Sequence, residues 1–181
     1  MLKKFLPALL GAVILLTGIF SATASAAENK ILIAYFSWSG KTEKVAQIIQ
    51  RDTGGTLFKI QPANPYPTEY KACSDRASNE VATGARPAIS NRVADMDSYD
   101  VVFVGFPIWW YNAPMIIDTF LESYDFSGKT VVPFCTSGGS LIGVSMDKIR
   151  LHCPDSNVVD GLTANRSSEV APWVKKLGYA K

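Results

Sequence analysis

The sequence predicts an α/β protein with one doubly wound, five-stranded parallel sheet. Apolar runs without alternation at Lys30–Phe36, Asp100–Phe106 and Thr130–Thr136 indicate strands that are covered on both faces. Segments with helical spacing separate these runs, and strands that alternate with helices are typical of a parallel sheet. The 181 residues are 48% hydrophobic and 19% charged, which suits one globular domain with a full core.

The elements follow one another with few ambiguities. After the first strand, apolar residues at helical spacing predict a helix over Lys41–Asp52, which Gly54 and Gly55 end. Pro133 lies inside the expected strand Thr130–Thr136, where it removes a ladder donor, but we retain the strand. The remaining expected elements are strands at Thr56–Ile60 and Asn157–Val159 and helices at Thr68–Thr83, Ala113–Ser123, Leu141–Leu151 and Ser167–Leu177.

The N-terminus has the layout of a signal peptide. Lys3 and Lys4 precede the apolar segment Ala8–Phe20, and Ala24-Ser25-Ala26 is a small-residue cleavage site. A membrane anchor is the alternative, but this apolar segment is shorter than the roughly 20 residues that span a bilayer. We therefore predict a signal peptide at 1–26 and one domain at 27–181, exported to the periplasm or secreted, with no stable membrane insertion after cleavage.

Charge and composition exclude several functions. The net charge of +2 is supplied by Lys3 and Lys4, so the mature chain is nearly neutral and nucleic acid is not an expected partner. His152 is the single histidine, which argues against a Ser-His-Asp hydrolase and against a metal site. A Cys-x5-Arg phosphatase loop is missing, because Leu141 occupies the arginine position after Cys135. We nominate no catalytic residue.

Three cysteines leave two possibilities open. In an exported protein Cys73 and Cys153 could form a disulfide, with Cys135 buried at the end of a strand. The alternative is that all three are isolated thiols.

Three loops are expected to meet at one site. In a doubly wound sheet, ligands bind beyond the carboxyl ends of the strands. The loops at this edge are Ser37–Thr42, Pro107–Ala113 and Thr136–Ser140, each of which follows one of the three longest apolar strands.

The first loop suits a monophosphate. Its tail Gly40-Lys41-Thr42 resembles the end of a nucleotide-triphosphate loop, but Tyr35 stands where that motif needs its first glycine. The strand ending in Gly105-Phe106 offers no carboxylate to hold a metal, as a triphosphate site would require. Hydroxyls of Ser37, Ser39 and Thr42, with N–H groups that open a helix, can donate to phosphate oxygens.

The other two loops suit a flat aromatic group. The second loop consists of Pro107, Ile108, Trp109, Trp110, Tyr111, Asn112 and Ala113. At least one of its rings should face the cleft, although Trp109 or Trp110 could simply close the end of the sheet. The third loop places Gly138 and Gly139 after Thr136 and Ser137, which permits close approach of the backbone to a ligand, or only a plain turn. A flat ring with a phosphate-bearing tail describes FMN.

These loops carry a resemblance to a known family. The segments "ILIAYFSWSGKTEKVA", "YDVVFVGFPIWWYNAPM" and "YDFSGKTVVPFCTSGGS" resemble the flavodoxin family, and most closely its short flavodoxin-like branch, over Lys30–Leu177. The resemblance implies strand order 2-1-3-4-5 and non-covalent FMN. It implies that the phosphate is held by Ser37, Ser39, Gly40, Lys41 and Thr42. By the same resemblance, Pro107 to Ala113 would line the isoalloxazine and Thr136 to Gly139 its far edge.

The expected function is electron transfer through bound FMN to a redox partner protein or a small-molecule acceptor. The alternative is an NAD(P)H-dependent FMN reductase of quinones or other small acceptors. The acidic docking surface of well-known flavodoxins is missing from this nearly neutral chain, so their partners do not carry over. Pro62–Pro87, with Tyr66, Tyr70 and Arg86, forms either a roof over the cleft or a separate surface excursion. No basic side chain lies in the second or third loop, which predicts a low reduction potential.

Overall fold

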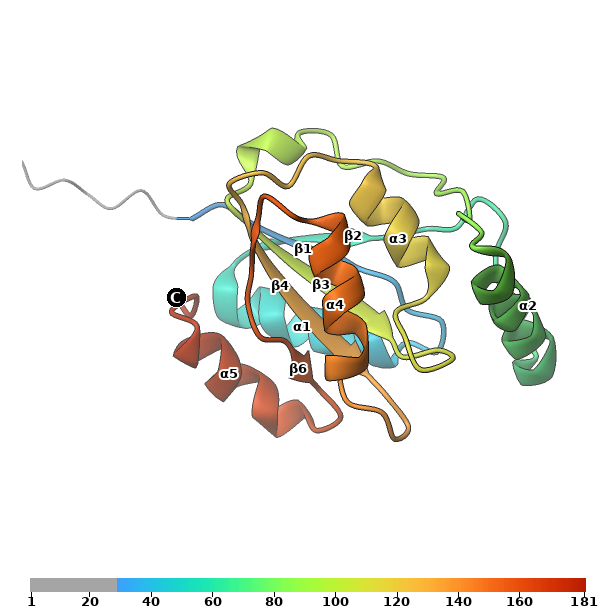
Figure 1. Cartoon of the computed structure of the whole chain (residues 1–181). Coiled ribbons are helices and arrows are strands. Elements are labelled where there is room, and N and C mark those ends of the chain that lie inside the picture. Colours follow the sequence, from blue (N-terminus) through green and yellow to red (C-terminus); the bar gives the residue numbers. More distant parts are fainter. Residues whose placement is uncertain (1–28) are drawn as a thin grey trace, which may run out of the picture.

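A computed structural model describes residues 29–181, and the expected signal peptide lies outside them. The sheet has strand order β2-β1-β3-β4-β5, with all neighbours parallel and a sixth strand, β6, beside β4 (Figure 1). The α/β class and the order 2-1-3-4-5 are therefore confirmed. The strands are β1 Ile31–Tyr35, β2 Thr56–Lys59, β3 Val101–Pro107, β4 Thr130–Thr136, β5 Asn157–Val158 and β6 Leu162–Thr163. The α-helices are α1 Lys41–Thr53, α2 Tyr70–Thr83, α3 Met115–Glu122, α4 Gly143–His152 and α5 Val170–Lys176.

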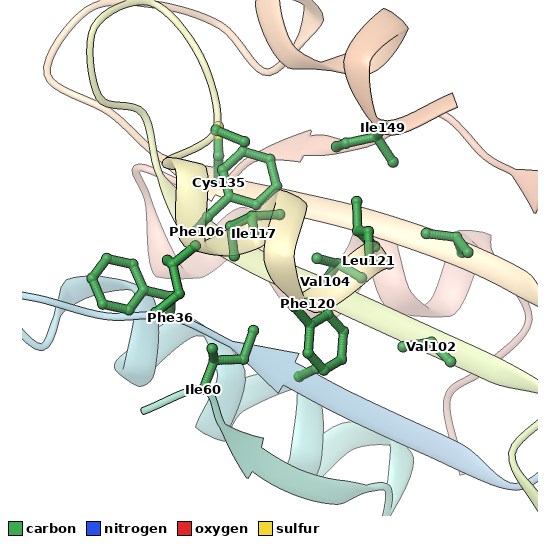
Figure 2. Packing of buried hydrophobic residues seen from close by; sticks show 14 of the residues in the cluster. Phe36, Ile60, Val102, Val104, Phe106, Ile117, Phe120, Leu121, Cys135 and Ile149 are labelled. Carbon is green, nitrogen blue, oxygen red and sulfur yellow. The ribbon is translucent and has the colours of Figure 1, made fainter. Parts of the chain in front are cut away.

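Two helical layers cover the sheet, as Figure 1 shows: α1 and α5 lie on one face, α3 and α4 on the other, and α2 lies out to the side. Successive strand residues divide between these layers because side chains alternate along a strand. Leu32 belongs to the core under α3 and α4, whereas Ile33 belongs to the core under α1 and α5. In the first of these cores, Phe120 of α3 packs over the sheet beside Ile117 and Leu121 (Figure 2).

Helix starts differ from the sequence predictions by up to three residues, and local chemistry explains the shifts. The helix expected from Thr68 begins at Tyr70, because the Glu69 carboxylate accepts hydrogen bonds from the N–H groups of Lys71 and Ala72 and so caps it. The last helix was expected from Ser167, but Ser167–Glu169 is a 3-10 turn that leads into α5. No helix within residues 29–181 is long and apolar enough to cross a membrane.

Pro133 is compatible with its strand because the neighbouring edge is split. The carbonyl groups of Val131 and Cys135 accept hydrogen bonds from the N–H groups of Val159 and Ala164. The backbone N–H and C=O groups of odd-numbered residues in β4 therefore point toward β5 and β6. Pro133 lies between Val131 and Cys135, opposite the gap from β5 to β6, where no ladder donor is required. The chain passes closely here: a Cβ on Gly161 would lie 2.7 Å from the Pro133 carbonyl oxygen. The fifth strand expected at Asn157–Val159 is present as β5, whereas β6 at Leu162–Thr163 is an additional strand that the sequence analysis does not predict.

All three cysteines are free and buried, so the structure agrees with three isolated thiols and not with a disulfide between Cys73 and Cys153. Burial raises the pKa of Cys135 to about 11 and the pKa of Cys153 to about 11, and it also raises the pKa of Cys73. Because the thiolate is the nucleophile, these groups should be unreactive at neutral pH.

We expect a chromogenic disulfide reagent to label no more than a small fraction of thiol per chain in the native protein at pH 7. In strong denaturant it should label three. Rapid labelling of one or more thiols in the native protein would contradict the burial described here.

Candidate functional site

A cleft of about 530 Å³ opens where the expected loops meet, at the carboxyl ends of the strands. Its walls come from the first loop, the second loop, the third loop and helix α2. The lining residues are Trp38, Tyr70, Cys73, Ser74, Ala77, Ile108, Trp109, Trp110, Tyr111, Ser137, Gly138, Gly139 and Ser140. No lining residue that the structure describes carries a charged side chain, so the cleft suits a largely neutral, flat group.

The first loop ends at the start of helix α1. Gly40 caps α1 with φ of 81°, a left-handed conformation that favours glycine. The Ser37 hydroxyl accepts from the Glu43 N–H at 3.2 Å, while the N–H groups of residues 39–42 find no acceptor within residues 29–181. Unpaired donors at a helix start hold phosphate well.

The hydroxyls of this loop have different surroundings. Ser39 is exposed and Ser37 is half-buried, and neither residue lines the cleft. Thr42 is buried, and its Oγ1 lies 2.9 Å from Oγ1 of Thr136. This contact joins the first and third loops. Lys41 is exposed beside them, and Trp38 is the residue of this loop that borders the cleft.

The second loop forms a tight turn with an uncommon backbone. Trp109 and Asn112 exchange backbone hydrogen bonds of 2.9 and 3.0 Å across the turn. Between them, Trp110 has φ of 46° and Tyr111 has φ of 62°, the only positive values outside glycine in residues 29–181. Positive φ at both central residues defines a type I′ turn, which normally takes Asn-Gly or Gly-Gly. Bulky residues there store about 1–2 kcal/mol each, and such strain concentrates at functional sites.

We expect Tyr111→Gly to relieve this strain. Because Tyr111 is 76% exposed, removal of its ring loses little packing, and the protein should gain up to about 1 kcal/mol of stability. Tyr111→Ala is the matched control, since it removes the ring and keeps the strain. Denaturant unfolding measures both, and equal stability of the two variants would contradict a strained turn.

The aromatic rings of this loop have separate positions. Trp109 packs against Phe36, Tyr66 and Trp38, with ring centroids 5.4, 5.1 and 6.4 Å away. It therefore closes the end of the sheet and borders the cleft at once. Trp110 is half exposed, and its Nε1–H donates to the Ser74 carbonyl of α2 at 3.0 Å.

The third loop presents backbone to the cleft. The Ser137 hydroxyl accepts from the Gly139 N–H at 3.1 Å. A Cβ on Gly138 or Gly139 would meet no heavy atom within 4 Å, so packing of the protein against itself does not require glycine there. The bare backbone instead leaves space at the rim of the cleft for a ligand to approach.

A sequence model of the family described as Flavodoxin matches residues 30–177. This chain belongs to the flavodoxin family. Among solved structures, this chain resembles a protein from Bacteroides eggerthii DSM 20697 that is assigned as a flavoprotein. The two share 41% identity, the match covers 83% of this chain and 98% of the other, and the TM-score is 0.76.

Two further relatives are informative. A protein from Bacteroides uniformis ATCC 8492, also assigned as a flavoprotein, shares 37% identity over 81% of this chain and 98% of the other, with a TM-score of 0.74. A flavoprotein from Lactobacillus acidophilus NCFM, solved in complex with FMN, shares 26% identity over 80% of this chain and 98% of the other, with a TM-score of 0.68. No curated protein matches this chain.

Helix α2 forms a wall of the cleft, in agreement with the roof alternative for Pro62–Pro87. The Tyr66 hydroxyl donates to Glu80 at 2.7 Å, and Arg76 donates to the same carboxylate at 2.8 Å. Tyr66 in turn supports Trp109, so the wall is fixed to the second loop. Tyr70 borders the cleft.

Arg86, also expected near the cleft, lies elsewhere. Its guanidinium binds both Glu122 carboxylate oxygens, at 2.7 and 2.8 Å, which lowers the pKa of Glu122. Arg86 therefore connects the end of the Pro62–Pro87 segment to α3.

Several residues that line the cleft, and one that supports it from outside, are not predicted by the sequence. Trp38 could have been found, since an aromatic residue after a buried strand is itself a signal, but only its hydroxyl neighbours were nominated. Cys73, Ser74 and Ala77 of α2 gave no signal because that helix is polar and weakly periodic. Asn165 gave none either, although its side-chain oxygen accepts from the Ser137 N–H at 2.9 Å.

Proposed function

We propose that this protein binds FMN non-covalently in the cleft and transfers electrons through it. The observation that carries the proposal is the meeting of a helix start rich in free N–H groups with an uncharged, aromatic cleft of about 530 Å³. One end suits a phosphate and the other a flat ring. The relative solved with FMN supports the choice of this cofactor.

The residues divide the work of binding. Ser37, Ser39 and the N–H groups of Gly40 to Thr42 would hold the phosphate, with charge added by Lys41. Ile108 to Asn112 and Ser137 to Gly139 would flank the ring, and Trp109 would make the broadest contact with it. When bound, FMN supplies one- or two-electron redox chemistry, while the protein orients the ring and limits its contact with water.

The test is purification of the mature chain followed by absorption and mass spectrometry. A yellow protein that releases FMN on denaturation supports the proposal. Failure of the folded, flavin-free protein to take up FMN in equilibrium dialysis would refute it.

We expect the bound flavin to have a low reduction potential. No cationic side chain borders the cleft in residues 29–181, so negative charge added by reduction would have no nearby partner. An anaerobic redox titration checks this, with free FMN in the same buffer as reference. A potential well above that of free FMN would contradict the expectation.

A second use of the flavin is supported by α2. Tyr70 and Ser74 of this helix line one side of the cleft. A pocket for a small acceptor requires such a wall, whereas a surface that docks a redox partner protein does not. The alternative proposal is thus an NAD(P)H-dependent reductase of quinones or other small acceptors. Anaerobic mixing with NADH or NADPH separates the two, because rapid bleaching of the flavin indicates a reductase and slow bleaching indicates a shuttle for a redox partner protein.

We also propose that the protein acts after export, in the periplasm or outside the cell. The layout of residues 1–26 supports this. Mass spectrometry of protein from the exported fraction should find a mature N-terminus at Ala27.

A further inference from the structure

One short segment outside the cleft contacts the third loop near its start and the chain just after its end. The Ser137 N–H donates to Oδ1 of Asn165 at 2.9 Å, and the Ile142 N–H donates to Oγ1 of Thr163 at 2.8 Å. Neither Thr163 nor Asn165 lines the cleft. Both can therefore affect a ligand only through the loop.

Strand β6 sets the position of these two side chains. Its residues pair with Phe134 and Cys135 of β4, and the Ala164 N–H donates to the Cys135 carbonyl at 2.7 Å. Oγ1 of Thr163 also lies 3.8 Å from the Cys135 thiol. The segment is thus fixed by the same strand from which the loop departs.

Inside the loop little else fixes the backbone. Gly138 and Gly139 have open space around them, and the bond within the loop is the one from the Gly139 N–H to the Ser137 hydroxyl. Because glycine has the largest backbone freedom, this stretch gains most from anchors at its two ends. A loop ordered before binding loses less entropy when a ligand binds.

We infer that Asn165 and Thr163 are positioning residues, which hold the Ser137–Ser140 backbone in its binding conformation and so set the affinity and potential of bound FMN. This inference rests on the proposed function. It assigns a role to β6, an element with no other evident task at the site.

The experiment uses the full mature chain loaded with FMN and two isosteric variants, Asn165→Leu and Thr163→Val. Each removes one acceptor, and we expect the FMN dissociation constant to rise about 3- to 10-fold in each. The midpoint potential should shift as well, which a loss of general stability would not produce. Asn157→Leu is the control: it makes the same change at the exposed Asn157 of β5, and it should leave affinity and potential unchanged.

A second measurement does not depend on FMN. Amide exchange of Ser137 in the flavin-free protein should accelerate in Asn165→Leu, and exchange of Ile142 should accelerate in Thr163→Val. Asn165→Asp keeps an acceptor oxygen and should retain slow exchange at Ser137. If Asn165→Leu does not fold, Thr163→Val and Asn165→Asp still decide the matter.

The outcomes are distinguishable. A wild-type chain that takes up no FMN defeats the proposed function. Wild-type binding with unchanged affinity and potential in both variants defeats the inference alone, as does unchanged amide exchange at Ser137 and Ile142.

Discussion

Gly105→Ala should destabilise the protein by about 3 kcal/mol or more, because the added methyl has no space in the centre of the sheet. A Cβ at this position would lie 2.1 Å from Cζ of Phe134 and within 2.8 Å of two further ring atoms. The Phe134 ring is fully buried between the sheet and the layer of α1 and α5, so it has nowhere to move. Glycine in β3 thus accommodates the phenyl ring of the neighbouring strand.

Denaturant unfolding with a double-mutant cycle measures this effect. Phe134→Leu alone should lose about 1–2 kcal/mol, but in the Gly105→Ala background it should recover part of the loss, because the clash is removed. Gly138→Ala is the control, since a Cβ there meets nothing within 4 Å, and its stability should change by less than about 0.5 kcal/mol. Additive losses in the cycle would show that Phe134 is not the cause.

Trp109→Ala should have the largest effect on FMN affinity. Its ring borders the cleft, and replacing it removes about 1 kcal/mol of ring stacking and about 2 kcal/mol of apolar contact with the flavin, or roughly 100-fold in the dissociation constant. The contacts with Phe36 and Tyr66 are lost too, so stability should fall by about 2–3 kcal/mol for this half-buried side chain.

Titration of flavin fluorescence and denaturant unfolding separate the two losses. Trp109→Phe keeps an aromatic face and should retain most of the affinity, with a loss of about tenfold or less. If Trp109→Ala binds FMN as tightly as the wild type, Trp109 supports the sheet end and the flavin lies elsewhere.

The sequence contained nearly all of the fold and only part of the site. Continuous apolar strands are a strong signal because a parallel sheet must bury both faces, and the strand order followed from the family resemblance. Pro133 argued against a strand at β4, because proline has no N–H to donate to a neighbouring strand. In the structure Pro133 lies opposite the gap between β5 and β6, so no acceptor is left without a donor. Only the arrangement of distant strands reveals this gap, and no local sequence pattern contains it.

For the three loops, the sequence predicts the location but not the conformation. Their location at one edge of the sheet follows from the order of strands and helices, whereas their backbone conformation does not. Two bulky aromatic residues are poor candidates for positive φ, so turn chemistry argues against the conformation that Trp110 and Tyr111 adopt. The α2 wall and Asn165 reach the site through tertiary contacts alone, and a single sequence shows no such contacts.

The gap opposite Pro133 divides the strand position next to β4 into two short strands, β5 and β6, which contact different parts of the protein. Because proline leaves no amide to be satisfied at the boundary, substitutions on one side need not propagate to the other. Strand β5 lies at the edge of the sheet, while Thr163 of β6 accepts a hydrogen bond from Ile142 just after the third loop. Evolution can thus vary the edge of the sheet and the anchoring of the third loop independently within a stretch of seven residues, from Asn157 to Thr163.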